Sequence, residues 1–407
     1  MNALKKLFVA SASLAAVAGA SAQSATTIHI IGSTAYRAAA ITGIENILNA
    51  GYTFGYTGTS GATKASQATF VGTTKGTNTS VVIECSWTGS VGGVQTLAQQ
   101  SPVITNSSFI SPTLNTLTTT GASLAAPVFE AAITADVSMS DSFQGSTAFS
   151  GGSSYLNLID TKVGVVPFVW AKGLTNDATV AASFQHVTNM TPLAAKAMLG
   201  SGVLPLSLLT GTATDSSIDV LAVGRDEDSG TRLDAFAETG FGIFALPVQY
   251  APTIAGGVIT GVAQYPANTV NNISYPIGQS GYSSGGTLAT TLNTPIASGT
   301  TDAPLYQNKF VLIGYFGTSD AANVNGGNNN LTYNGVAYSA TAVQEGQYTF
   351  WSYEHLMYRP AYQHTTGGNV ADQLAQQILT QDAVQAGILL STMHVSRTVE
   401  GGVITHN

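Results

Sequence analysis

Charge is scarce in this sequence. Only 8% of its 407 residues are charged, whereas a typical soluble protein is about a quarter charged. Its 13 lysines and arginines are too few and too scattered for the basic surface that nucleic-acid binding needs. A disordered chain combines low hydrophobicity with high charge. Because 44% of the residues here are hydrophobic, the composition excludes that class as well.

Cysteine and long apolar runs are also nearly absent. The single Cys85 cannot form an internal disulfide or a cysteine-based zinc site. Its strand-like surroundings predict a buried, inert thiol. Beyond the N-terminal segment, the longest apolar run is residues 163–171, well short of the roughly 20 residues of a membrane-spanning helix. The sequence therefore predicts no such helix in the mature chain.

The N-terminus has the pattern of a secretory signal peptide. Lys5 and Lys6 precede the small and apolar run 7–18, and a small-residue cleavage pattern ends at Ala22. We expect residues 1–22 to be removed and the mature protein to be periplasmic or secreted. Loss of the two lysines changes the formal charge from −8 to about −10 (−8 − 2).

Strand and helix patterns alternate along the rest of the chain. Apolar and β-branched runs predict strands at 27–31, 81–85, 163–170, 218–223, 310–316 and 348–357. Helices are predicted at 35–49, 191–199, 232–238 and 370–388, with a short one ending at 100. We expect a loop or insertion at 101–127, few helices in 250–308 and an Asn/Gly-rich turn at 322–335. This order predicts an α/β protein with mainly parallel pairing.

Three turns between a predicted strand and a predicted helix share one chemistry. They combine glycine with Ser or Thr, at 32–34, 89–93 and 229–231. A helix start has unpaired N–H groups and a positive dipole end, glycine lets the backbone approach a ligand, and hydroxyls add donors. One such turn can be only a helix cap. Three of them predict a site where neutral dipoles bind a small oxyanion.

Two charged residues complete the predicted site. Arg225 precedes Ser229 by four residues, and its guanidinium can bind an oxyanion bidentately while the flanking acids hold it in position. Asp141 would repel a fully ionised anion but accept a hydrogen bond from monohydrogen phosphate, which retains a proton that sulfate lacks. The alternatives are a solvated acidic turn around Arg225 and a turn or capping role for Asp141. Arg232 is interpreted as a second anion contact or as a partner of Asp228.

The order of these motifs resembles the phosphate-binding proteins of bacterial ABC importers, which have the type II periplasmic-binding-protein fold. The matching motifs are Gly32-Ser33-Thr34, Gly89-Ser90-Val91-Gly92-Gly93, Asp136-Val137-Ser138-Met139-Ser140-Asp141 and Arg225 with Ser229-Gly230-Thr231. The resemblance implies a two-lobed α/β fold, each lobe a mainly parallel sheet flanked by helices. It implies that 23–167 and 345–407 form lobe 1 and that 168–344 form lobe 2.

The resemblance also implies a function. The protein would capture inorganic phosphate between its lobes and deliver it to a membrane ABC permease. It would act as a monomer, with no catalytic residue, cofactor, metal or nucleic-acid partner. The implied phosphate ligands are Ser33, Thr34, Ser90 and Asp141 from lobe 1, and Arg225, Ser229, Gly230 and Thr231 from lobe 2. More residues separate Ser90 from Asp141 in the sequence than is usual in the family, because the Ser/Thr-rich segment 101–127 lies between them.

Other functions also fit the sequence. A secreted surface or matrix protein could keep the fold without transport, and its large loops allow this. A binder of another oxyanion would use similar turns. A phosphatase would need an added base or metal, but the six histidines are scattered, and no His-Glu-x-x-His or Gly-x-Ser-x-Gly motif surrounds them. The one local acid–histidine pair, Glu354-His355, is interpreted as the edge of an aromatic strand.

Overall fold

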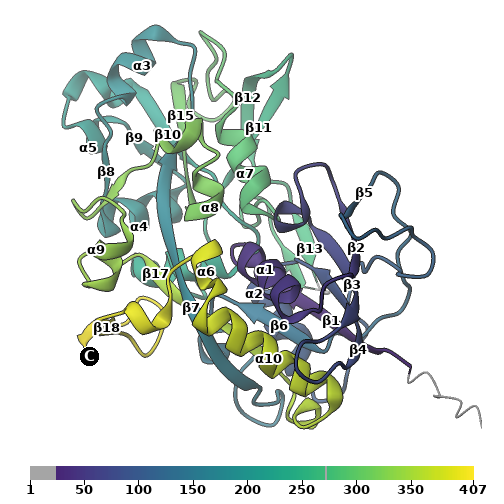
Figure 1. Ribbon diagram of the computed structural model, residues 1–407. Helices are drawn as coiled ribbons and strands as arrows, with labels where there is room; N and C mark the ends of the chain where they lie inside the picture. The colour runs from purple at the N-terminus through teal and green to yellow at the C-terminus, as the bar shows by residue number, and fades with distance from the viewer. Residues whose placement is uncertain (1–23, 271–272) are drawn as a thin grey trace, which may run out of the picture.

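The computed structural model describes residues 24–270 and 273–407 (Figure 1). The predicted signal peptide, residues 1–22, lies outside the described residues. Within the described ranges, no helix has both the length and the apolar character needed to cross a membrane.

One eleven-stranded sheet runs through the molecule in the order β5-β2-β3-β4-β1-β6-β17-β7-β15-β10-β9 (Figure 1). Its strands are β1 (Thr26–Gly32), β2 (Thr53–Thr57), β3 (Gln67–Thr73), β4 (Ser80–Ser86), β5 (Ala122–Leu124), β6 (Val137–Ser140), β7 (Ile159–Lys172), β9 (Val203–Pro205), β10 (Ile218–Ala222), β15 (Lys309–Gly317) and β17 (Trp351–Tyr358). Short two-stranded pairs are formed by β8 (Asn189–Met190) with β16 (Thr332–Tyr333), β11 (Tyr250–Ala255) with β12 (Val258–Gln264), β13 (Asn268–Val270) with β14 (Ile273–Tyr275), and β18 (Val395–Ser396) with β19 (Thr405–His406).

Strand β7 belongs to both halves of the large sheet. Residues 159–167 of β7 pair with β17, and residues 168–172 pair with β15. We call the half with β1–β6 and β17 lobe 1, and the half with β9, β10 and β15 lobe 2. The predicted two-lobed α/β class is confirmed. The residue boundaries 23–167, 168–344 and 345–407 stay a prediction.

Helices flank both halves of the sheet (Figure 1). They are α1 (Arg37–Ile47), α2 (Ser90–Ala98), α3 (Ala178–Phe184), α4 (Pro192–Ser201), α5 (Ser207–Thr210), α6 (Gly230–Glu238), α7 (Gly285–Leu292), α8 (Thr318–Ala321), α9 (Ala340–Gln344) and α10 (Thr366–Thr380). Helices α1, α2 and α6 each follow a strand at the centre of a lobe, namely β1, β4 and β10.

Parallel pairing holds at the centre of each lobe. Strand β1 is parallel to β4 and β6, and β10 is parallel to β15. The lobes are joined by antiparallel pairs that involve β17 and β7, and antiparallel pairs also occur at the sheet's edges. Because α1 and α2 follow neighbouring parallel strands, they start at the same edge of the sheet, which is where ligands bind in open α/β sheets.

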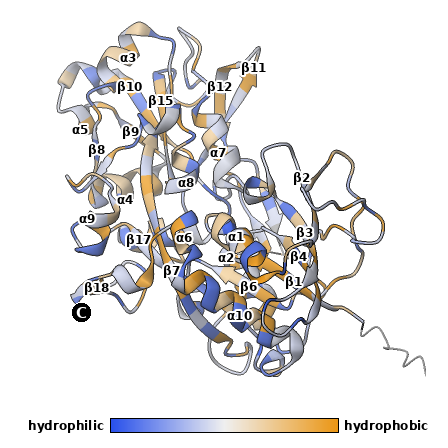
Figure 2. Cartoon of the chain, in the orientation of Figure 1, coloured by the Kyte–Doolittle hydropathy of each residue, from blue (hydrophilic) through white to orange (hydrophobic). Residues whose placement is uncertain are grey.

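The hydrophobic residues concentrate on the strands and on the helix faces that meet them (Figure 2). Strand β7 is buried from Val163 to Ala171. Its Trp170 ring lies 5.4 Å from the ring of Tyr315 on β15, which packs the two strands together. Cys85 is fully buried and burial raises its pKa, so the predicted buried, inert thiol is confirmed.

The structure differs from the sequence prediction at the last helix. The last helix was predicted over 370–388, but α10 ends at Thr380 and a 3₁₀ turn follows at Asp382–Gln385. Asp382 accepts hydrogen bonds from Asn46 (2.9 Å) and Gln377 (2.8 Å), which hold the chain in this tighter turn. The described part of 250–308 has few helices, as expected; α7 lies there, and its N-terminus is capped by a hydrogen bond from the Thr287 amide to the Ser284 hydroxyl (3.1 Å).

Candidate functional site

The turn between β1 and α1 holds Ser33 and Thr34 at the carboxyl end of β1. Gly32 has a φ of 114°, and an added Cβ would overlap the main-chain oxygen of Met139. Glycine is therefore required at this position. The Ser33 amide donates to the same Met139 oxygen at 2.8 Å, so the turn is fixed against β6.

Ser33 contacts a buried carboxyl group. Its hydroxyl donates to Oε2 of Glu354 on β17 (3.2 Å) and accepts a bond from the Tyr36 amide (3.3 Å). Glu354 is fully buried, and its Oε1 has no hydrogen-bond partner among the described residues. Burial, together with the negative charge of Asp141, raises the pKa of Glu354 well above its usual range. The sequence interpretation of Glu354 as part of a strand edge is therefore wrong, because β17 lies between β6 and β7.

Thr34 and Arg225 meet across the two lobes. Nη2 of Arg225 donates to Oγ1 of Thr34 (3.2 Å) and to the main-chain oxygen of Ser283 (2.9 Å). Nε donates to the main-chain oxygen of Tyr282 (3.0 Å). The side chain of Arg225 is thus held by neutral oxygens rather than by the flanking acids that the sequence indicated. Arg225 is only 2% exposed.

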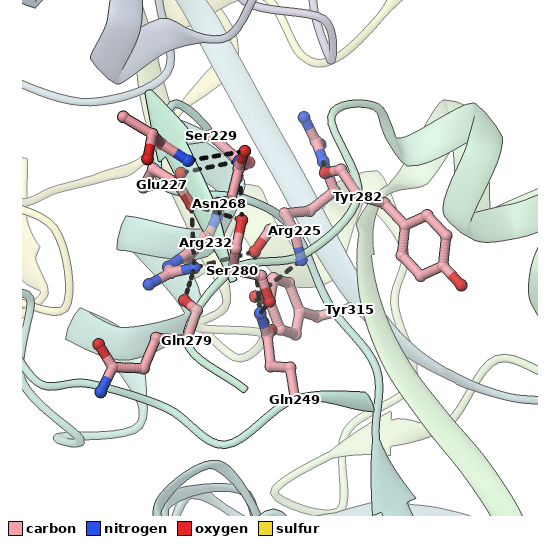
Figure 3. A network of polar contacts seen from close by, with 11 residues as sticks. Arg225, Glu227, Ser229, Arg232, Gln249, Asn268, Gln279, Ser280, Tyr282 and Tyr315 are labelled. Atoms are coloured by element: carbon pink, nitrogen blue, oxygen red, sulfur yellow. Dashed lines mark hydrogen bonds and ion pairs between the residues drawn. The ribbon is translucent and has the colours of Figure 1, made fainter. Parts of the chain in front are cut away.

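A second network fixes the main chain of Arg225 (Figure 3). The Tyr315 hydroxyl accepts a bond from the Arg225 amide (3.1 Å) and donates to Oε1 of Gln249 (2.9 Å). Nε2 of Gln249 donates in turn to the Arg225 carbonyl (3.0 Å). Burial raises the pKa of Tyr315 to about 12, so its hydroxyl keeps the proton that it donates.

Arg232 supports this network from α6 (Figure 3). Its Nη1 donates to the carbonyls of Arg225 (3.2 Å) and Gln279 (2.8 Å). Its ion pair is with Glu227 (4.0 Å) rather than with the predicted partner Asp228. Glu227 also accepts a hydrogen bond from the hydroxyl of Ser280 (2.8 Å). Arg232 therefore positions the Arg225 loop.

Helix α6 begins directly against Asp141 of lobe 1. Ser229 is its N-cap, and the Ser229 hydroxyl accepts a bond from the Arg232 amide (3.3 Å). The Thr231 hydroxyl donates to Oδ2 of Asp141 (3.3 Å). An added Cβ at Gly230 would overlap Oδ1 of the same carboxylate. The positive end of the α6 dipole and the Asp141 carboxylate are thus in contact.

Asp141 is almost completely buried, at 1% exposure. Its amide donates to the hydroxyl of Ser90, the first residue of α2, at 3.2 Å. Its Oδ1 has no hydrogen-bond partner within the described part of the chain. Burial raises the pKa of Asp141, while hydrogen bonds from Ser90 and Thr231 and the charge of Arg225 act in the opposite direction. Burial is the larger effect, so the environment favours the protonated form of this carboxyl more than water does.

The start of α2 is covered by lobe 2. The amides of Val91 and Gly92 donate to the main-chain carbonyl of Asp228, at 2.9 and 3.3 Å. The sequence predicted that these two amides bind an oxyanion. In the structure they bind the Asp228 carbonyl instead. In this arrangement, the turn at 89–93 presents the Ser90 hydroxyl to the site.

The structure places the predicted residues in two connected clusters between the lobes. Thr34 contacts Arg225, and Ser90 and Thr231 both contact Asp141. Ser229 and Gly230 form the start of α6, beside these contacts. Ser33 differs, because its hydroxyl is bonded to Glu354.

Some residues that shape the site were missed by the sequence predictions. They are Glu354, Tyr282, Ser283, Gln249 and Tyr315. Tyr282 and Ser283 act through main-chain carbonyls, which leave no residue-type signal. For Glu354, the available signal was a carboxyl in a strand of aromatic residues, which is unusual in a buried strand.

No protein-family model matches this chain, and no curated protein sequence matches it. The fold is similar to solved structures of very low sequence identity. One, from Clostridium perfringens, is described as a substrate-binding protein of a phosphate ABC transporter with bound phosphate; it is 13% identical, with 90% of this chain and 100% of that chain covered and a TM-score of 0.47. An ABC-type phosphate transport receptor from Vibrio cholerae is 10% identical, with 89% and 99% covered and a TM-score of 0.45.

A third structure, a phosphate-binding protein from Stenotrophomonas maltophilia, is 13% identical, with 94% of this chain and 87% of that chain covered and a TM-score of 0.34. At such identities the likeness concerns the fold alone. The site described above rests on the contacts of this chain itself.

Proposed function

We propose that this protein is a solute-binding protein that captures inorganic phosphate between its lobes and delivers it to a membrane ABC permease. One observation carries the proposal. Buried donors from three separate turns and a buried carboxyl, Asp141, meet at the contact between the lobes. Thr34 and Ser90 come from lobe 1, and Arg225 and Thr231 come from lobe 2.

Attraction of the anion is assigned to Arg225 and to the start of α6. The Arg225 side chain is already held by the carbonyls of Tyr282 and Ser283. Since its rotamer is fixed before the ligand binds, little side-chain entropy is lost on binding. The hydroxyls of Thr34, Ser90 and Thr231 supply neutral donors. This combination binds a dianion with one full positive charge, in keeping with the low charge of the chain.

Selection of the anion is assigned to Asp141. Its Oδ1 is buried and has no protein partner in the described structure. The hydroxyl of monohydrogen phosphate can donate to this oxygen, whereas sulfate has no proton to donate. With sulfate bound, the buried Asp141 carboxylate would receive no hydrogen bond from the ligand and would lie beside its two negative charges. The site therefore favours phosphate.

Entry of the ligand requires the lobes to separate. Separation breaks the contacts of Thr34 with Arg225, of Asp141 with Thr231 and of Asp228 with the start of α2. Closure then buries the anion among donors that are already oriented, as in other hinge-closing binding proteins. This cycle needs no catalytic step, and capture outside the cell agrees with the predicted signal peptide.

Isothermal titration of the mature protein tests the proposal. Protein freed of bound anion is titrated with phosphate and, separately, with sulfate. We expect one phosphate per chain and sulfate affinity weaker by on the order of a hundredfold, since an unsatisfied buried charged group costs about 3 kcal/mol. Absence of phosphate binding favours a structural protein, and equal affinities favour a binder of another oxyanion. Turnover of phosphomonoesters identifies a phosphatase. Each of these three results would overturn the proposal.

A further inference from the structure

A cluster of one histidine and two glutamates lies in lobe 1, outside the contacts described above. His29 on β1 and Glu84 on β4 are paired residues of two neighbouring parallel strands. Nε2 of His29 is 3.5 Å from Oε2 of Glu84. Glu130 comes from the segment between α2 and β6. One side-chain ligand atom from each of the three residues lies within 4.8 Å of the others.

The polar atoms of this cluster are poorly satisfied. Glu84 is fully buried, and neither of its carboxylate oxygens has a hydrogen-bond partner among the described residues. Nε2 of His29 has none either. Its 3.5 Å separation from Glu84 is an ion-pair distance but too long for a good hydrogen bond. A buried carboxylate left in this way is costly.

The net charge of the cluster indicates which kind of ligand it could bind. Asp136 also contacts the His29 ring, so three carboxylates surround one imidazole. Even with the imidazole protonated, three ionised carboxylates leave the cluster with about two net negative charges. A divalent cation bound at Nε2 requires the neutral imidazole and would offset two of the three carboxylate charges.

Asp136 holds the His29 ring in the orientation that a metal ligand needs. Its Oδ2 is 3.1 Å from Nδ1 of His29 and also accepts a bond from the His29 amide (2.9 Å). Metal-bound histidines usually donate their second ring nitrogen to such a carboxylate, which fixes the ring and its tautomer. The Phe109 ring packs against the imidazole in an edge-to-face arrangement, with the ring centroids 4.9 Å apart. Nε2 is therefore left to face Glu84.

We propose that His29 Nε2, Glu84 and Glu130 bind one divalent transition-metal cation, with Zn²⁺ as the probe. Imidazole and carboxylate ligands together suit Zn²⁺ better than Ca²⁺ or Mg²⁺. Two Zn²⁺ ligands at about 2.1 Å and a tetrahedral angle are about 3.4 Å apart, close to the 3.5 Å between His29 and Glu84. Glu130 is partly exposed, so water can reach a fourth position.

The proposed ion would join the long inserted segment to the sheet. The Glu130 amide donates to the main-chain oxygen of Phe109 (2.8 Å), and Phe109 packs against His29. Residues 101–127 lie in this same segment. A metal bridging Glu130 to β1 and β4 would thus tie the Ser/Thr-rich insertion to lobe 1.

Metal titration of the full chain, expressed without an affinity tag and treated with chelator, tests the proposal. We expect one Zn²⁺ per chain by calorimetry and by elemental analysis, and a rise in the unfolding temperature. Co²⁺ should give the visible absorption bands of a four-coordinate site. Glu130→Gln changes a partly exposed residue, so the fold should persist, and Zn²⁺ affinity should fall by at least about tenfold.

A matched control and a conservative second variant sharpen the result. Glu345→Gln removes an exposed carboxylate that also lies beside a histidine, His394 (2.7 Å), and should leave Zn²⁺ binding unchanged. Asp136→Asn should weaken Zn²⁺ binding by about tenfold to a hundredfold. No Zn²⁺ binding at micromolar concentrations, or wild-type affinity in Glu130→Gln, would overturn the proposal. Phosphate titration of Glu130→Gln should match the wild type, so the metal site and the phosphate site are judged separately.

Discussion

Gly230 of lobe 2 lies directly against the Asp141 carboxylate of lobe 1. Gly230 is the first residue of α6, and an added Cβ there would overlap Oδ1 of the Asp141 carboxylate. The backbone of Gly230 does not have a positive φ. Helix propensity alone would therefore favour alanine at this position. What excludes a side chain is the carboxylate of the opposite lobe.

Gly230→Ala should prevent full closure of the lobes. We expect phosphate affinity to fall by at least about tenfold, because donors on the two lobes can no longer reach one anion together. The unfolding temperature should change little, since the overlap lies at the contact between lobes. Calorimetry and thermal unfolding measure the two effects. Gly145→Ala is the control, because an added Cβ there meets open space. Wild-type phosphate affinity in Gly230→Ala would contradict the proposed site.

Asp141→Asn should change which anion binds. A carboxylate can accept the phosphate proton at either of its two oxygens, whereas the asparagine amide has only one oxygen. The substitution also removes the negative charge that repels sulfate. We expect phosphate affinity to fall by about tenfold to a hundredfold and sulfate affinity to rise. Competition titrations with both anions measure the ratio. An unchanged ratio would show that Asp141 does not select the ligand. Asp372→Asn on α10 is the matched control.

Arg225→Lys should weaken phosphate binding despite keeping the charge. A lysine cannot make the bonds that Arg225 makes to Thr34, Tyr282 and Ser283 from two nitrogens. We expect a loss of about tenfold to a hundredfold, since a hydrogen bond to a charged group contributes about 1.5–3 kcal/mol. Arg359→Lys changes an arginine whose bond is to an exposed carbonyl, and its affinity should equal that of the wild type. Equal losses in both variants would argue against a role for Arg225.

Asp226 should make the protein less stable as the pH rises. It is 8% exposed, and burial raises its pKa to about 7, with Glu227 adding to the effect and Arg225 and Arg232 opposing it. The unfolded value is about 3.9. Between these values the folded state holds a proton that the unfolded state has released. The free energy of unfolding therefore falls as the pH rises, by about 1.4 kcal/mol per pH unit for one proton, and the fall ends above pH 7.

Asp226→Asn should flatten this dependence. Urea unfolding at a series of pH values between about 5 and 8 should show the variant gaining stability over the wild type as the pH rises. Glu345→Gln, at an exposed carboxylate, should keep the wild-type slope. A parallel pH dependence in Asp226→Asn and the wild type would rule out a proton held by this carboxyl.

The elements near the site could be predicted because their patterns are local. The apolar runs at 27–31, 81–85 and 218–223 match β1, β4 and β10 to within a few residues. Buried strands between helices read as short, continuous apolar runs. The turns after them were predicted for the same reason, since glycine next to Ser or Thr at a helix start is a local signal.

The rest of the site depends on contacts that no local pattern shows. The carbonyls of Tyr282 and Ser283 orient Arg225 from a Gly/Ser-rich stretch. The Asp228 carbonyl covers the start of α2 only because the lobes meet there. His29 and Glu84 were not singled out as a pair, because their adjacency follows from the register of β1 with β4.

Strand β7 would guide the proposed motion of the two lobes. Its pairing partner changes from β17 to β15 between Pro167 and Phe168. Pro167 has no amide hydrogen, so bending at this point disturbs few ladder bonds. An unbroken strand, unlike a flexible linker, returns the lobes to the same register after every bend. A single inserted residue there would turn the distal side chains of β7 to the opposite face of the sheet, so the proposed closure depends on the exact length of this strand.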